Sequence, residues 1–231
     1  MKLFIKIVVV LVAVFSSSFI FSQEAALIGK VKAKLDLVND YIADGKMKTD
    51  VTFIKAPIGN VKVYYKKPNK FKLKRDGGIS ILPKGGVTVN MSSIVTTNDF
   101  DIIAAGEEII SGVKTKKIKL LPRSDNSDVV LTTMYIDEAN LLIRKAVTTT
   151  KENGTYEIEM NYGKYSSYGL PDKVIFSFNT KDYKMPKGIT MEFDDDDKKP
   201  KTDKMKNKKG KVEITYTNYI INKGIEDSVF K

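Results

Sequence analysis

The 231-residue sequence contains no cysteine, no histidine and no tryptophan. Without cysteine the chain forms no disulfide and offers no thiolate to a metal or a substrate. Without histidine it lacks the commonest general base and the commonest metal ligand of proteins. The two absences together remove common schemes of nucleophilic catalysis. Catalysis is therefore the less favoured class of function.

Acidic residues are the remaining candidates for chemistry, and their patterns are not typical of an active or metal site. Glu157 and Glu159 fall on the polar side of an expected strand, where carboxylates are more often solvated than catalytic. The four aspartates at 194–197 lack the spaced acids and the glycine turn of an EF-hand loop. No phosphate-binding glycine loop precedes a helix. We predict that the protein is not an enzyme and binds no metal or cofactor.

Residues 1–22 have the pattern of a secretory signal peptide. Lys2 and Lys6 precede an apolar run at 7–15, and small residues offer cleavage after Ser22 or, alternatively, after Ser18. The apolar run is short for a membrane span, and no later segment is apolar enough to cross a bilayer. We predict an exported, soluble protein of a bacterial envelope, located in the periplasm.

The chain is basic, with a formal net charge of +11, of which the two signal-peptide lysines supply two. An exported protein rarely meets nucleic acid, so an anionic lipid surface is the favoured partner of such a charge. A basic surface that serves only solubility explains the charge equally well.

Antiparallel strands dominate the rest of the sequence. In the segment 61–91, apolar and polar residues alternate with a period of two, as in Val61, Val63 and Tyr65. Glycine- and proline-rich turns separate four short strands there, so this segment predicts a meander with one apolar face. Further strands are predicted at 47–55, 100–110, 113–121, 129–137, 141–150, 155–162, 173–179, 189–193 and 211–221.

Two other segments differ from the strands. Residues 24–45 have apolar side chains at steps of three and four, which predicts a helix that ends at Gly45 and either packs as ordinary core or lies over the sheet as a lid. Residues 194–210 contain a single apolar side chain, Met205, and this composition predicts a mobile charged loop.

The prediction is therefore a single mainly β (α+β) domain at 23–231, with one helix and ten or more strands. Such a sheet has more apolar area than one helix covers. A second sheet, closure into a barrel, or a cavity for an apolar ligand would each solve this problem, and periodicity does not choose among them.

Several motifs, in their order along the chain, resemble the family of periplasmic outer-membrane lipoprotein-sorting proteins, the LolA-like lipoprotein carriers. The motifs are Tyr65-Lys66-Lys67-Pro68-Asn69-Lys70-Phe71 with Ile79-Ser80-Ile81, Gly106–Lys114 with Leu120-Leu121-Pro122, Tyr135-Ile136-Asp137, Gly169–Lys173 and Tyr216–Ile225. The resemblance covers most of the mature chain.

The resemblance implies an incomplete antiparallel β-barrel, a half-barrel, with lid elements over an apolar cavity. It implies a monomeric periplasmic carrier that shields lipoprotein acyl chains or phospholipid between an inner-membrane transporter and an outer-membrane acceptor, without a cofactor or nucleic acid. The residues that would line the cavity are Leu27, Val31, Leu35, Val38, Ile42, Val51, Phe53, Val63, Tyr65, Phe71, Leu73, Ile79, Ile81, Val87, Val89 and Met91.

Lys67 is the candidate for a basic gate, at a position where the family often has arginine. Lysine lacks the rigid fork of donors that arginine has, which argues against a gating bond from this position to the lid. The segment 194–210 resembles an insertion, and lid helices are hard to find after Met91.

Two other functions remain open at this point. One is a sensor or scaffold of the same fold that binds a protein partner through a sheet edge or through basic residues such as Lys114, Lys116 and Lys119, without lipid transport. The other is a closed structural β protein without a ligand.

Overall fold

The computed structural model describes residues 23–50, 58–68, 70–75, 99–152, 154–179 and 209–230. Within this part, residues 23–35 are helical. The elements that follow are β1 (Asp40–Asp50), β2 (Gly59–Lys66), β3 (Lys70–Arg75), β4 (Phe100–Ile110), β5 (Val113–Pro122), β6 (Val129–Asp137), β7 (Leu142–Thr150), β8 (Gly154–Asn161), the short 3-10 helix η1 (Ser166–Tyr168), β9 (Lys173–Asn179), β10 (Lys209–Ile221) and the 3-10 helix η3 (Asp227–Phe230).

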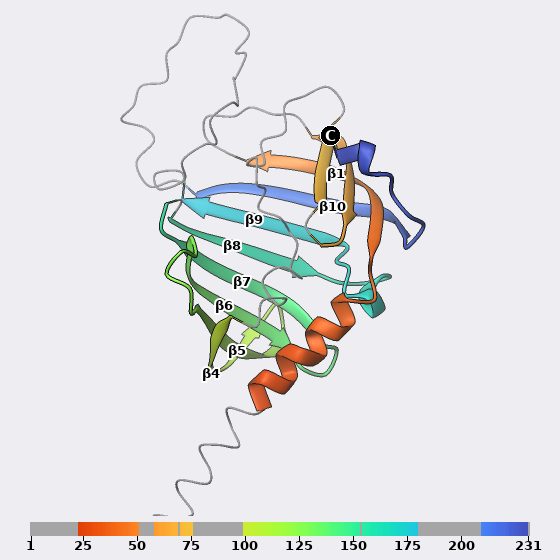
Figure 1. The fold of residues 1–231 in the computed structure, drawn as a ribbon. Helices are drawn as coiled ribbons and strands as arrows, with labels where there is room; N and C mark the ends of the chain where they lie inside the picture. The colour runs from red at the N-terminus through yellow and green to blue at the C-terminus, as the bar shows by residue number, and fades with distance from the viewer. Residues whose placement is uncertain are drawn as a thin grey trace, which may run out of the picture.

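The ten strands form one antiparallel sheet in the order β3-β2-β1-β10-β9-β8-β7-β6-β5-β4 (Figure 1). Among the described strands, only the β1–β10 pairing joins strands that are far apart in the strand sequence; each other pair consists of strands with consecutive numbers. The sheet begins at β3 and ends at β4, and these two strands do not pair, so it is an open half-barrel. This confirms the predicted fold class, and the described strands by themselves do not close into a barrel.

One face of the sheet, which we call the inner face, carries the core. Val63 lies opposite Ala43 on one side and opposite Leu73 on the other, so the apolar sets of β1, β2 and β3 share this face. The helix residues Leu27 and Val31 belong to the same buried cluster. The alternation predicted for β2 is therefore confirmed, and the opposite, outer face carries the polar set.

The hairpin predicted around Ser111 and Gly112 is also confirmed. Ser111 has φ +49° and Gly112 has φ +80°. A two-residue turn with positive φ at both positions matches the right-handed twist of the flanking strands, which is why this dipeptide connects β4 to β5.

The predicted helix at 24–45 is too long. The helical residues stop at 35 and β1 begins at Asp40, so the first strand starts seven residues before the predicted Met47. Gly45 does not end the helix, because it lies inside β1. A Cβ at this position would lie 2.7 Å from the carbonyl oxygen of Thr215 on β10. The glycine instead permits close approach of two strands at a bulge.

Several other predictions fall outside the described residues. These are the signal peptide, the distal half of the strand at 47–55, the strands that contain Ile79 and Val87, any lid after Met91, the strand at 189–193 and most of the charged segment 194–210. Lys209 and Gly210, at the end of that segment, are the first residues of β10. In the described ranges, no helix is long and apolar enough to span a bilayer.

Candidate functional site

The inner face is apolar across almost the whole width of the sheet. Its largest fully buried apolar side chains come from β1, β2 and from every strand between β5 and β9, together with the helix. They include Val31, Met47, Val63, Ile118, Met134, Ile136, Ile143, Ile158, Met160 and Val174. A continuous apolar surface of this kind is the largest feature of the described chain.

The helix lies on this face, near the ends of β6, β7 and β8 (Figure 1). Lys34 Nζ donates a hydrogen bond of 2.6 Å to the carbonyl oxygen of Asn140 in the β6–β7 turn. Leu35 packs beside Gly169, which follows η1. The helix is thus seated across one end of the sheet, where the turns of successive hairpins gather.

The structure brings together eight of the predicted cavity residues. Leu27, Val31, Val38, Val63 and Tyr65 are buried in the core cluster, and Leu35, Phe71 and Leu73 are partly buried against it. Their role in holding a ligand remains a prediction. Seven others lie outside the described residues: Val51, Phe53, Ile79, Ile81, Val87, Val89 and Met91.

Ile42 was wrongly placed in this set. It lies on β1 between the buried residues Tyr41 and Ala43, so its side chain belongs to the outer face. The four-residue step from Val38 to Ile42 fits a helix, but the chain is extended here and a period of two applies.

A tyrosine cluster at the helix end of the inner face was not predicted. Tyr219 is central to it, with ring centroids 5.4 Å from Tyr41, 4.9 Å from Tyr165 and 5.1 Å from Tyr216. Tyr65 stacks on Tyr41 at 5.2 Å. The signal available in the sequence was the phase of each tyrosine within its strand, but the pairing of β1 with β10 is what gathers them.

Three tyrosines of this cluster have a raised pKa. Burial raises the pKa of Tyr41, Tyr216 and Tyr219 well above the usual phenol value. The hydroxyl of Tyr219 donates to the carbonyl oxygen of Pro171 at 2.7 Å. This end of the apolar face is thus amphipathic, with aromatic rings and neutral hydroxyl groups side by side.

A pair of threonines makes a second polar spot in the middle of the sheet. Thr132 on β6 and Thr148 on β7 are fully buried, at 2% and 0% exposure, and their hydroxyl groups lie 3.1 Å apart. Each hydroxyl therefore has a partner, which keeps the cost of burying them small.

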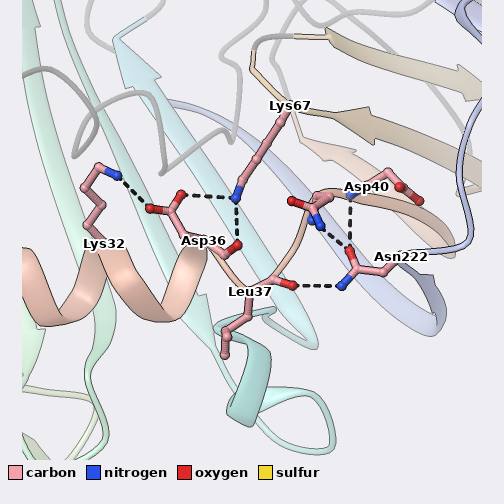
Figure 2. A network of polar contacts seen from close by, with 7 residues as sticks. Lys32, Asp36, Leu37, Asp40, Lys67 and Asn222 are labelled. Atoms are coloured by element: carbon pink, nitrogen blue, oxygen red, sulfur yellow. Dashed lines mark hydrogen bonds and ion pairs between the residues drawn. The ribbon is translucent and has the colours of Figure 1, made fainter.

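Lys67 forms a bond that the sequence argued against. It follows β2, and its Nζ donates to the carbonyl oxygen of Asp36 at 2.7 Å and pairs with the Asp36 carboxylate at 3.1 Å (Figure 2). Asp36 directly follows the helical residues, and its other carboxylate oxygen pairs with Lys32 at 2.6 Å. The hydrogen bond from Lys32 has the largest effect and lowers the pKa of Asp36. Burial opposes this effect, and the bond from Lys67 lowers the pKa further.

Lysine reaches this position without the guanidinium fork because the carbonyl and the carboxylate of one residue, Asp36, offer two acceptors to a single ammonium group. The β2–β3 turn is thereby tied to the end of the helix, as Figure 2 shows.

Asn222, just beyond β10, closes the same junction from the other side (Figure 2). Its Nδ2 donates to the carbonyl oxygen of Leu37 at 2.8 Å, and its Oδ1 accepts from the backbone N–H of Asn39 at 2.7 Å. The carboxylate of Asp40 accepts from the backbone N–H groups of Lys223 and Gly224. The link between helix and β1 is thus fixed to the end of β10.

The basic strand β5 is largely neutralised. Lys114 and Lys116 both pair with Glu107, at 2.7 and 3.2 Å, and Lys117 pairs with Glu108 at 3.0 Å. In the described residues, no three acidic side chains gather as a metal site would require.

Comparison with known proteins shows which solved structures share this architecture. No protein-family model and no curated protein matches the sequence. Among solved structures, a DUF1329 family protein from Desulfovibrio piger matches with a TM-score of 0.55 and 11% identity, over 91% of this chain and 97% of that one. A LolA superfamily protein from Nitrosomonas europaea matches with a TM-score of 0.53 and 9% identity, over 88% and 96%. The chain has a LolA-like fold.

An outer membrane lipoprotein-sorting protein domain from Vibrio parahaemolyticus has the same LolA-like fold, with a TM-score of 0.52 and 12% identity over 90% of this chain and 96% of that one. Identities this low establish the fold alone. They agree with the resemblance found in the motifs, and they leave the role of the inner face to be argued from its own residues.

Proposed function

We propose that this protein is a monomeric carrier that shields lipoprotein acyl chains or other lipids against its inner face during transfer through the periplasm toward the outer membrane. The observation that carries the proposal is a sheet of ten described strands whose inner face is apolar from β2 across to β5, and of the described elements the helix lies over one end of that face.

The energetics of an acyl chain fit such a surface. Each methylene group removed from water contributes about 0.8 kcal/mol, so an apolar trough holds lipid without specific polar contacts. The neutral hydroxyl groups of the tyrosine cluster, at the helix end, suit the polar boundary where an acyl chain meets its head group. Neither the proposed carrier activity nor its cargo requires a cofactor or catalysis.

The proposal assigns residues 1–22 to a signal peptide and residues 23–231 to one domain. The partners it requires are an inner-membrane transporter that loads the carrier and an outer-membrane acceptor that unloads it. Lys67 acts as the gate, because its bonds to Asp36 tie the β2–β3 turn to the helix that lies over the inner face.

The first test is mass spectrometry of lipids extracted from the protein purified in its native, processed form. Acylated peptide or phospholipid in near-stoichiometric amount supports the carrier and identifies its cargo. A lipid-free protein that also fails to take up a fluorescent fatty acid refutes it.

Substitution tests the inner face directly. Phe71 is only partly buried, on β3, the outermost described strand on its side of the sheet, so Phe71→Asp is expected to leave the protein folded and to abolish lipid uptake. Ile42→Asp, on the outer face, is the matched control and is expected to keep uptake. Val63 is fully buried at 0% exposure, so Val63→Asp is expected to unfold the protein and cannot serve.

A second candidate is a sensor or scaffold that binds a protein partner in the envelope without carrying lipid. Among the described strands, the eleven-residue β4 is the last on its side of the sheet, and Ile103 and Ile109 are exposed on it, at 46% and 71%. An edge of this kind accepts an added strand. This alternative predicts that a partner protein co-purifies with the chain. Its binding is expected to be unchanged by Phe71→Asp and to be lost on Ile109→Lys.

A further inference from the structure

The outer face of β1, β2 and β3 concentrates the positive charge of the chain. The seven lysines that point outward there, which we call the lysine face, are Lys46, Lys48, Lys62, Lys66, Lys70, Lys72 and Lys74. Between Gly59 and Arg75 the sequence has seven lysines and arginines and no acid. The β4–β5 hairpin, in contrast, has four lysines and three acids.

The arrangement of the lysine face costs folding stability through electrostatic repulsion, and the fold itself does not require it. Lys62 lies directly opposite Lys74, and Lys66 lies directly opposite Lys70. Like charges in these positions repel and destabilise a sheet. Two acids reduce this cost, because Asp44 pairs with Lys62 at 3.3 Å and Asp227 bridges Lys66 and Lys70.

An apolar row crosses the lysine face between the two lysine pairs. Ile220 on β10 lies opposite Ile42, and Ile42 lies opposite Tyr64. Ile220 is 44% exposed, and Lys74 Nζ lies 5.5 Å from the centre of the Tyr64 ring. An aromatic ring and two isoleucines flanked by lysines form a surface with both apolar and cationic contacts to offer.

We propose that the lysine face docks on an anionic phospholipid bilayer. Flexible lysine side chains suit mobile head groups, which do not present the fixed bidentate geometry that selects arginine. The row of Ile220, Ile42 and Tyr64 suits the region between head groups and acyl chains. The proposal concerns the outer face and does not depend on whether the inner face holds lipid.

The test is cosedimentation of the natively purified, processed protein with vesicles. One set contains equal parts of phosphatidylcholine and phosphatidylglycerol, and the other contains phosphatidylcholine alone. The variant Lys46→Gln/Lys62→Gln/Lys74→Gln removes three exposed lysines from three successive strands. The control Lys114→Gln/Lys116→Gln/Lys119→Gln removes the same number of charges from β5.

Each lysine near an anionic surface strengthens partitioning about fivefold, so the triple variant is expected to lose about 100-fold of its affinity for the anionic vesicles. The control is expected to lose less than about threefold. Tyr64→Ser, with every charge kept, is expected to weaken the binding that remains at high salt.

Three results would overturn the proposal. One is equal binding, or none, to the two kinds of vesicle. Another is an equal loss in both triple variants, which would show that net charge alone acts. The third is binding to polyglutamate without binding to vesicles, which would indicate an acidic protein as the partner. Lipid extraction from the same preparations tests the carrier function separately, so failure of one proposal does not count against the other.

Discussion

The bond between Lys67 and Asp36 leads to the most direct prediction about how the helix is held. Lys67→Met keeps the apolar stem of the side chain and removes the ammonium group. The variant loses one charge-assisted hydrogen bond of 2.7 Å and one ion pair of 3.1 Å. The two side chains are 27% and 35% exposed, so solvent screens the pair, and we expect a loss of about 1 kcal/mol.

A loss of this size has a local readout. Because the bond joins the β2–β3 turn to the end of the helix, its removal is expected to raise the open population of the helix about fivefold. Hydrogen–deuterium exchange of residues 23–38 measures this change. Lys70→Met is the matched control, because Lys70 pairs with Asp227 at 2.6 Å on the other side of the same turn and makes no bond to the helix.

The pH dependence gives a second readout of the same bond. The pKa of Asp36 is lowered in the folded state, so its carboxylate stabilises the fold above the unfolded pKa of about 3.9 and loses that contribution as the pH falls through the lowered value. The difference between wild type and Lys67→Met is therefore expected to shrink below about pH 4. Equal helix exchange in Lys67→Met and Lys70→Met at neutral pH would refute the reasoning.

Three further predictions concern polar side-chain interactions between distant segments or across turns. Asn222→Ala removes the bonds to Leu37 and Asn39 and leaves at φ +56° an alanine, which tolerates the left-handed region less well than asparagine, so urea unfolding is expected to show a loss of about 2 kcal/mol, part of which Asn222→Gly restores. Arg144→Met leaves the carboxylate of Asp137, whose side chain is 3% exposed, without its ion-pair partner, so a loss of about 3 kcal/mol is expected, smaller if Asp137→Leu is added. Bonds from Lys66 and Lys70 lower the pKa of Asp227 to about 2, so residues 225–230 are expected to exchange faster as the pH falls from 4 toward 2, and unchanged exchange there would contradict this ion bridge.

Strand order and strand phase could be predicted from the sequence because both depend on local chemistry. The hairpin from β4 to β5 follows from alternation on either side of Ser111 and Gly112, and the structure pairs Ile110 with Val113. The pairing of β1 with β10 joins distant parts of the chain, and no pattern within either strand predicts which strand it pairs with.

The boundary between helix and β1 shows why local patterns fail at a junction. The residues from Val38 to Ile42 fit a helical step of four as well as a strand that starts at Asp40. The backbone bonds that Asn222 makes to Leu37 and Asn39 stabilise a non-helical link, and Asn222 comes from the far end of the chain. Tertiary contacts therefore decide the boundary, and propensity does not.

The candidate site divides along the same line. Val63, Tyr65, Phe71 and Leu73 could be placed on the apolar face from their phase alone. The tyrosine cluster could not, because Tyr41 and Tyr219 meet only through the pairing of β1 with β10. The side-chain geometry of lysine argued against the Lys67 bond. The bond could not be predicted, because the position of Asp36 relative to the β2–β3 turn depends on where the helix ends.

The two anchorages of the helix determine how it can open. Its C-terminal end is held twice, by Lys67 on Asp36 and by Asn222 on Leu37 (Figure 2). Lys34, one residue before the last helical residue, adds an exposed single hydrogen bond to the β6–β7 turn, which costs little to break. We therefore predict that the helix opens from its N-terminal half, which is held by the apolar packing of Leu27, Ile28 and Val31, with residues 36–39 as the hinge. Lys67→Met loosens the hinge itself, so it should increase exchange at residues 34–38 more than at residues 24–30.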